Sequence, residues 1–341
     1  MVSEVRTAGV LILSAQDKVE HPKTESPISA HTPELDLLAR LPFVDVLGRS
    51  VMLRVIDRLK AAAVEPVTVL AEIPDGLDAG NVNRLKQDVP FRVRPTIEQF
   101  AQQGAQLVVC LRLGPYAEID FAELLRFHAA KKACYTTVYH QARKLPVFVA
   151  DLVRPAKTIS ALLDWLDACQ IACARFPFAD YVNELESLSD LRRLAKDGLS
   201  RESQLSPAGE EVRPGVWFGE GAQVSSEARV VAPAFVGTNS IIRAGALVTR
   251  ASNVERDCEV DMGTTVEDST VLAETLAGPG LELVSVVADG SSLHDLRRHA
   301  HIDVEDKRIL ASMPAVQTPL RRIRAAVPAW LHATSQAPTE E

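Results

Sequence analysis

Two lysines in a polar segment are the first residues of this sequence whose types and spacing suggest chemistry. Lys18 and Lys23 follow an apolar run at residues 9–15 and lie in a stretch, residues 17–35, that is rich in Pro, Ser, Thr and His. If the apolar run is a strand of a parallel sheet, the lysines come after its carboxyl end, where such sheets bind ligands. A loop lysine that is simply solvated is the common alternative. Both lysines are therefore candidate phosphate ligands.

Four histidines are further candidates, and each has a structural alternative. His128 falls on the apolar stripe of a helix expected at residues 120–131, which favours a buried imidazole over a catalytic base. His294, His299 and His301 cluster together, and a histidine there could act as the base of an acyl transfer. They lie outside the regular repeat described below, which favours a surface strand or cap.

The composition excludes several classes of protein. The chain has 341 residues, 47% of them hydrophobic and 24% charged, with a formal net charge of −8. These values are typical of a globular protein of about two domains, argue against wholesale disorder and favour no nucleic-acid partner. No apolar run reaches the roughly 18 residues of a membrane helix, so we expect no transmembrane segment and a cytoplasmic location.

The cysteines predict neither disulfides nor a zinc site. There are five, an odd number, and none forms a Cys-x-x-Cys pair. Cys169 and Cys173 lie one helical turn apart, a spacing that could hold a metal, but helical core packing is the favoured interpretation. We expect buried thiols.

Alternating strands and helices must position the candidates in the first 200 residues. Apolar or β-branched runs at residues 9–15, 67–71, 107–111 and 135–139 predict strands, and apolar stripes at residues 51–63 and 120–131 predict helices. This order predicts an α/β domain whose parallel sheet is covered by helices on both faces.

The C-terminal half carries an aliphatic residue at every sixth position. The nine positions in this register are Val224, Val230, Val236, Ile242, Val248, Val254, Val260, Val266 and Leu272. A small side chain stands two residues before each, so two positions per hexad are fixed, which neither a helix nor a hairpin array explains. The pattern resembles the left-handed hexapeptide-repeat β-helix, with the nine residues in its core, and Gly278 breaks the register.

Three blocks of the first 200 residues resemble the sugar-phosphate nucleotidyltransferases, also called NDP-sugar pyrophosphorylases. They are AGVLILSAQ with residues 41–70, residues 107–140, and residues 178–199. Several members of that family also carry a C-terminal hexapeptide β-helix. The resemblance implies a Rossmann-like nucleotidyltransferase sheet, a nucleotide or sugar phosphate as ligand, and Mg²⁺ as cofactor if the protein is active.

The sequence departs from the family at the residues that carry catalysis. The family's glycine-rich phosphate loop corresponds to Ser14, Ala15 and Gln16, and its metal-binding aspartate falls on Gly114. By resemblance, Ser14, Ala15, Gln16, Lys18 and Lys23 are the nucleotide-binding candidates. Asp180 is the one residue that matches an acidic metal ligand, and a surface carboxylate near a helix start is its alternative. No catalytic residue is assigned.

These observations predict two domains and a C-terminal extension. An α/β domain at residues 1–205 is followed by a β-helix at residues 206–290 and an extension at residues 291–341, with a short basic helix and a disordered end. The predicted function is that of a nucleotidyltransferase-like protein of sugar-nucleotide or polysaccharide metabolism whose pyrophosphorylase activity is weak or lost. Alternatives are a non-catalytic nucleotide- or sugar-phosphate-sensing subunit that assembles with an active paralogue and, less favoured, an acyltransferase. We expect a homo- or hetero-oligomer formed through the β-helix.

Overall fold

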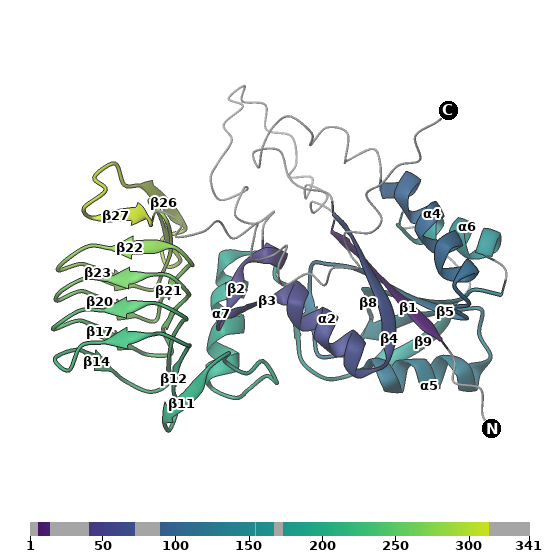
Figure 1. Cartoon of the computed structure of the whole chain (residues 1–341), viewed down its shortest axis with the longest axis horizontal. Coiled ribbons are helices and arrows are strands. Elements are labelled where there is room, and N and C mark those ends of the chain that lie inside the picture. The colour runs from purple at the N-terminus through teal and green to yellow at the C-terminus, as the bar shows by residue number, and fades with distance from the viewer. Residues whose placement is uncertain (1–5, 14–40, 72–88, 154, 167–172, 314–341) are drawn as a thin grey trace.

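The chain forms two regions that lie side by side (Figure 1). The structure, a computed structural model, describes residues 6–13, 41–71, 89–153, 155–166 and 173–313. We call the described residues up to 205 the α/β region and residues 210–313 the parallel-strand region. The predicted basic helix and chain end after residue 313 lie outside the described residues, as does Cys169. Within the described ranges, no helix has the length and hydropathy that crossing a membrane requires.

A six-stranded mixed sheet forms the centre of the α/β region, in the order β4-β1-β5-β8-β7-β9. Its strands are β1 (Thr7–Leu13), β4 (Val64–Ala71), β5 (Leu107–Arg112), β7 (Tyr135–His140), β8 (Arg143–Asp151) and β9 (Ala174–Phe178). The sequence predicted a parallel sheet, and β8 corrects that prediction because it runs antiparallel to both neighbours. The cause is a tight hairpin in which His140 pairs with Arg143 and Gln141 takes a left-handed conformation.

Helices cover both faces of this sheet. One face packs against α2 (Val51–Ala61) and α5 (Phe121–Lys131), and the other packs against α4 (Val89–Gln102) and α6 (Pro155–Leu166). Side chains at the helix starts explain two boundaries, because Ser50 accepts a hydrogen bond from the Leu53 N–H and Asp120 accepts them from the Ala122 and Glu123 N–H groups. The expected two-sided cover is therefore present.

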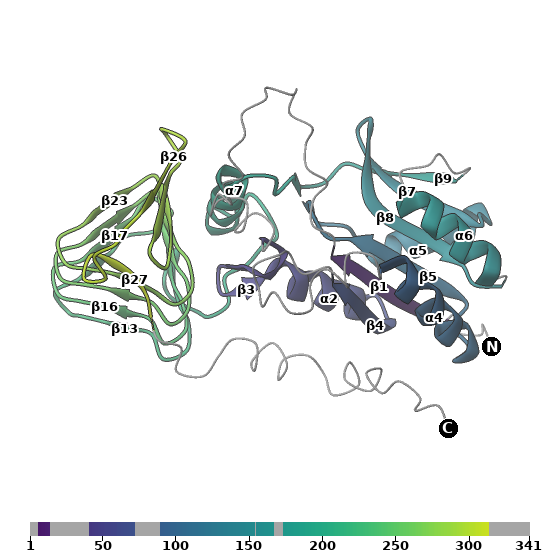
Figure 2. The same ribbon diagram turned by 90° about the horizontal axis from the view of Figure 1, so that it is seen from above.

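Short elements lie between the sheet and the parallel-strand region (Figure 2). They are the 3-10 helix η1 (Leu41–Phe43), the hairpin of β2 (Asp45–Val46) and β3 (Arg49–Ser50), the ladder of β6 (Tyr116–Ala117) and β10 (Val182–Asn183), and helix α7 (Leu188–Leu199). Helix α7 begins after Ser187, whose side chain accepts a hydrogen bond from the Asp190 N–H. Residues of these elements, Leu41, Tyr116 and Leu188 among them, share a hydrophobic cluster with Phe235 of the parallel-strand region.

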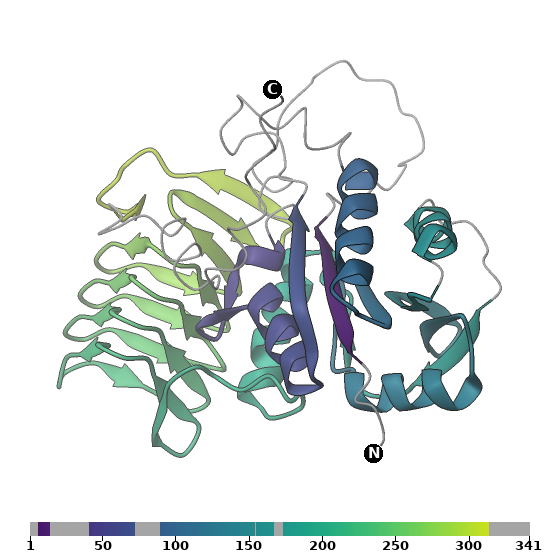
Figure 3. The ribbon, with the colours of Figure 1, turned by 45° about the vertical axis from the view of Figure 1, so that its right-hand side comes forward.

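Three sheets of parallel strands wind through the C-terminal region, coil upon coil (Figure 3). The first contains β12 (Val216–Phe218), β15 (Ala234–Val236), β18 (Asn253–Val254), β21 (Thr270–Val271) and β24 (Val286–Asp289); the second contains β13 (Gln223–Val224), β16 (Ile241–Ile242), β19 (Glu259–Val260) and β22 (Thr275–Ala277); the third contains β14 (Arg229–Val230), β17 (Leu247–Thr249), β20 (Thr265–Glu267) and β23 (Glu282–Val284). Antiparallel strands flank the coils: β11 (Glu210–Arg213) pairs with β12, and β25 (Ser292–Asp295), β26 (Ala300–Asp303) and β27 (Leu310–Ser312) pair at the other end.

The hexad valines fill the interior of the coils. Val236, Val248, Val254, Val260 and Val266 are fully buried in one hydrophobic cluster. Val230 and Ile242 belong to the same buried cluster, and Val224 packs partly buried against it. This interior is narrow and aliphatic, which explains why one residue in six must be apolar and usually β-branched.

The ninth hexad position needs a correction. Val271, and not Leu272, pairs with Val254 and enters the interior cluster. The reason is that the corner between Val266 and Val271 is one residue shorter than its predecessor, so paired residues stand 17 apart where earlier pairs stand 18 apart. The coil then continues through Ala277 and Leu283, so the register shifts before Val271 and not at Gly278.

A single hydrophobic cluster joins the two regions, and we call it the shared core. Its members from the α/β region include Leu47, Leu188 and Leu191. From the parallel-strand region it includes Phe235 and Leu272, the residue that the shorter corner displaces from the interior. Helix α7 contributes one buried apolar face to it, so the seam between the regions is packed like a domain interior.

Candidate functional site

Three parallel strands end together at one edge of the α/β sheet, which is where such sheets bind ligands. The register pairs Leu13 at the end of β1 with Ala71 at the end of β4, and Ile12 with Arg112 at the end of β5. The predicted nucleotide-binding residues come after Leu13 in the sequence. All five of them, Ser14, Ala15, Gln16, Lys18 and Lys23, lie outside the described residues.

Gly114 lies two residues beyond the end of β5, at the same edge. A Cβ atom added at Gly114 would meet no other atom of the described chain within 4 Å. Its φ is also not in the left-handed region that favours glycine. Among the described residues, neither space nor backbone conformation requires a glycine here, and this position has room for a side chain.

Asp180 follows β9 and is exposed, as a surface carboxylate would be. The ladder of β6 and β10 pairs Val182 with Ala117, and the Glu118 N–H donates to the Tyr181 carbonyl oxygen at 3.1 Å. Asp180 thus lies beside Glu118, whose pKa its negative charge helps to raise. The structure brings Asp180 to the edge of the sheet, with Glu118 as its neighbouring carboxylate.

Glu118 is buried, and its contacts hold the linker to the parallel-strand region. Its carboxylate accepts hydrogen bonds from the Gln204 N–H at 2.6 Å and from the Tyr116 hydroxyl at 3.3 Å. Arg58 Nη2 lies 3.8 Å away. Burial raises the pKa of Glu118, while the Gln204 N–H and the Arg58 charge oppose that rise. Its hydrogen bonds give Glu118 a structural role.

Among the residues that the structure describes, the donor set at this edge does not fit Mg²⁺. A magnesium site uses oxygen ligands in a near-octahedral arrangement, commonly with one or two carboxylates directed at the ion. Here Gly114 offers none, Glu118 is held by the linker, and Asp180 is exposed. Across the described ranges, no group of three or more His, Cys, Asp and Glu side chains is arranged to hold a metal ion.

The histidines occupy structural positions. His128 is 3% exposed, and its Nδ1 lies 2.8 Å from Thr136 Oγ1, which confirms the buried-imidazole interpretation. His294 and His301 face each other across β25 and β26 with ring centroids 4.8 Å apart. His299 lies in the turn between these strands. Together with the start of α7, His294 and His299 line a small cavity of about 310 Å³.

Glu255 is a buried carboxylate at the seam that the sequence did not single out. The Leu47 and Gly48 N–H groups of the β2–β3 hairpin donate to its two oxygens, each at 2.8 Å, and Asn253 Nδ2 donates to Oε1 at 2.6 Å. Burial, followed by the negative charge of Asp45, raises its pKa to about 7, against the effect of these donors. The sequence offered one signal for this site, which is that an acidic residue directly follows the core residue Val254.

Buried Arg192 makes the complementary contact from α7. Its Nη2 donates to the Ala251 carbonyl oxygen at 2.7 Å and to Asp268 Oδ1 at 3.1 Å. Glu255 of the parallel-strand region therefore accepts hydrogen bonds from backbone N–H groups of the α/β region. Arg192 of the α/β region donates a hydrogen bond to a backbone carbonyl of the parallel-strand region. This reciprocal arrangement fixes the hairpin and α7 against the coils.

Comparison with models of known protein families and with curated proteins gives no match.

Proposed function

We propose that this chain is a nucleotidyltransferase-like protein of sugar-nucleotide or polysaccharide metabolism whose pyrophosphorylase activity is weak or lost. The ligand is a nucleotide or sugar phosphate, held where β1, β4 and β5 end. The proposal includes a left-handed parallel β-helix for the parallel-strand region, assembly through it, and a cytoplasmic location. The single observation that carries the functional proposal is Gly114: the family's metal-binding position holds a glycine, at a place where the described residues leave room for a side chain.

The missing carboxylate explains why turnover should be slow. Attack of a sugar phosphate on a nucleoside triphosphate gathers negative charge at the α-phosphate, and stabilising that charge is usually the largest catalytic contribution. Removing one preorganised group of this kind typically costs about 10²- to 10³-fold in rate. The sequence also lacks the family's glycine-rich loop, so a loss of several orders of magnitude is expected.

The test is to add the missing group. Wild type is titrated with nucleoside triphosphates and NDP-sugars by calorimetry, with and without Mg²⁺, and pyrophosphate release is measured by a coupled assay with hexose 1-phosphates. We expect wild type to bind a nucleoside triphosphate or an NDP-sugar. We expect its pyrophosphate release to be far slower than about 1 per second, a rate within the usual range for enzymes. Gly114→Asp should make nucleotide binding depend on Mg²⁺ and increase pyrophosphate release at least tenfold.

Gly114→Asn is the matched control, because it has the same shape without the charge, and it should behave as wild type. Adding Asp180→Asn to Gly114→Asp should remove the gain. Wild-type turnover near 1 per second, or no binding of any nucleotide or NDP-sugar, would contradict the proposal. Tight wild-type binding with no gain in pyrophosphate release from Gly114→Asp would favour the non-catalytic sensing subunit. In that case the ligand would stabilise a fold that no longer catalyses the reaction.

A further inference from the structure

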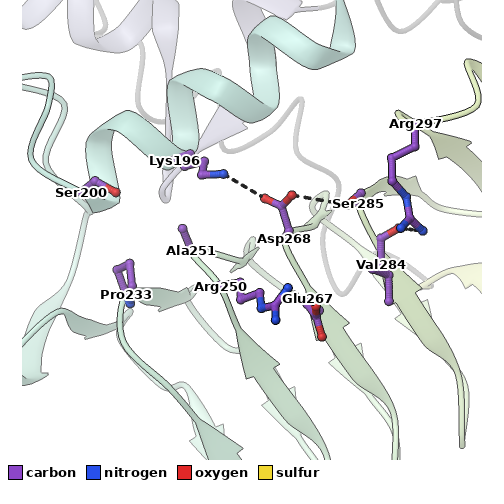
Figure 4. A pocket seen from close by; sticks show the side chains of 10 residues that line it. All are labelled: Lys196, Ser200, Pro233, Arg250, Ala251, Glu267, Asp268, Val284, Ser285 and Arg297. Atoms are coloured by element: carbon purple, nitrogen blue, oxygen red, sulfur yellow. Dashed lines mark hydrogen bonds and ion pairs between the residues drawn. The ribbon is translucent and has the colours of Figure 1, made fainter.

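A recess of about 460 Å³ lies between α7 and the parallel-strand region (Figure 4). Its walls come from three places: the last turn of α7, successive corners of the coils, and the turn between β25 and β26. The volume falls within the range of about 300–1,000 Å³ that small-molecule sites occupy. The recess is separate from the edge of the sheet where β1, β4 and β5 end.

The coil corners that line this recess differ in length. The corner at Arg250 and Ala251 uses two left-handed residues, whereas the next two corners use one each, Asp268 and Ser285. At these corners the spacing of paired residues falls from 18 to 17. Helix α7 lies along this column of corners, fixed at the longer one by Arg192. The end of α7 lies over the Pro233 corner, with Ser200 above Pro233, and Lys196 and Arg192 reach across to Asp268.

Charged side chains from three elements line the recess. Lys196 comes from α7, Arg250 from a coil corner, and Arg297 from the β25–β26 turn. Two carboxylates lie between them: Arg250 Nη1 is 2.8 Å from Glu267 Oε1, and Lys196 Nζ is 3.4 Å from Asp268 Oδ1. Arg297 Nη2 donates to the Val284 carbonyl oxygen. The lining therefore has three cations and two carboxylates, and Arg192, buried behind Asp268, adds a positive charge outside the lining. The result is a local excess of positive charge in a chain of net charge −8.

This lining selects a ligand that has one anionic group and several hydroxyls. Arginine side chains bind phosphate oxygens with paired, charge-assisted hydrogen bonds. Carboxylates accept hydrogen bonds from ligand hydroxyls, and the hydroxyls of Ser200 and Ser285 in the same lining can donate or accept. The side chains of Lys196 and Arg250 are 52% and 73% exposed, so an incoming ligand can reach them.

We propose that the recess binds a phosphorylated sugar or polyol, with its phosphate on Arg250 and Arg297 and its hydroxyls on Glu267 and Asp268. Because one wall is α7 and the others are coils, the bound ligand bridges the two regions and stabilises the seam. The site needs no metal ion. It does not depend on the function proposed for the edge of the sheet.

The experiment is calorimetric titration of the full chain with glucose 6-phosphate in EDTA at constant ionic strength. The 6-phosphate is chosen because a nucleotidyltransferase would use a 1-phosphate. We expect glucose 6-phosphate to bind, and we expect the dissociation constants of glucose and of inorganic phosphate to be at least tenfold higher. The double variant Arg250→Ala and Arg297→Ala should weaken binding at least tenfold, and Glu267→Gln should weaken it severalfold.

Arg308→Ala is the control, since Arg308 is exposed and pairs with Asp306 away from the recess; it should bind as wild type. Thermal melts of all variants check folding. Equal affinity for inorganic phosphate, or unchanged affinity in the double variant, would overturn the inference. Binding lost in Asp180→Asn but retained in the double variant would also overturn it, by placing the ligand at the edge of the sheet. Each of these results leaves the triphosphate titrations unaffected, so the two proposals fail independently.

Discussion

Replacing Glu255 with Gln should change how the stability of this protein depends on pH. Burial raises the pKa of Glu255 to about 7 from an ordinary value of 4.5, even though three N–H groups donate to its carboxylate. At intermediate pH the folded chain therefore holds a proton on Glu255 that the unfolded chain has released. The charged groups that act on it include Asp45, which raises its pKa, and Arg54 on α2.

The sign and size of the effect follow from this difference in pKa. Between pH 4.5 and pH 7 the folded state binds more protons than the unfolded state, so the free energy of unfolding falls as the pH rises. At 1.36 kcal/mol per pKa unit the interval corresponds to about 3 kcal/mol. Gln keeps the shape of the side chain and does not titrate. As the pH rises through this interval, the free energy of unfolding of wild type should thus fall by about 3 kcal/mol relative to that of Glu255→Gln. It should fall no further above about pH 7.

Urea unfolding of both proteins at half-unit steps from pH 4.5 to 8 measures this difference. Glu259→Gln is the control, because Glu259 pairs with Arg243 at 2.7 Å on the outside of the coils. The groups that remain in both proteins, Asp45 among them, largely cancel in the subtraction. A difference that stays constant across the pH range, or one in which wild type gains stability as the pH rises, would refute the argument that burial outweighs the three N–H donors.

Two further predictions concern the parallel-strand region. Val248→Asp places an unpaired charge in a dry interior and should lower the free energy of unfolding by several kcal/mol. Val231→Asp is the control, because Val231 is 39% exposed, and it should lower that free energy little. Equal melting temperatures for the two variants would contradict the buried hexad core. The protein should also self-associate through its coils, so light scattering at micromolar concentration should give a mass above the 37.1 kDa of one chain, and a monomer mass would remove this prediction.

Periodic burial made much of the fold predictable. A narrow aliphatic interior repeats one constraint many times, so Val236, Val248 and Val260 could be placed from their spacing alone. The shortened corner could not be placed, because Val271 and Leu272 are both aliphatic and a six-residue count cannot tell which one faces inward. The reversal of β8 was missed for a related reason: a two-residue turn without Gly, Pro, Asn or Asp leaves little local evidence of a hairpin.

The candidate site was less accessible to prediction because it depends on contacts between distant segments. Gly114 could be matched to its position from the flanking block, but only the structure shows that a side chain would fit there. Glu118 and Glu255 each bind backbone N–H groups far away in the sequence, Gln204 in one case and Leu47 with Gly48 in the other. The sequence does not mark backbone groups as partners, so no residue pattern could have revealed these contacts.

The shared core bears on how such a chain can be recombined. Residue 205 divides the α/β region from the parallel-strand region and looks like a natural boundary for exchanging them between proteins. The shared core crosses this boundary, however, and packs Leu188 and Leu191 of α7 with Phe235 and Leu272 of the coils. A chimaera that joins this sheet to foreign coils would leave that helix face against side chains of the wrong shape, and Arg192 facing a carbonyl that has moved. Exchanging α7 and the coils as one unit would keep these contacts, but the new unit would still have to match Leu47 in the shared core and supply an acceptor for the Leu47 and Gly48 N–H groups.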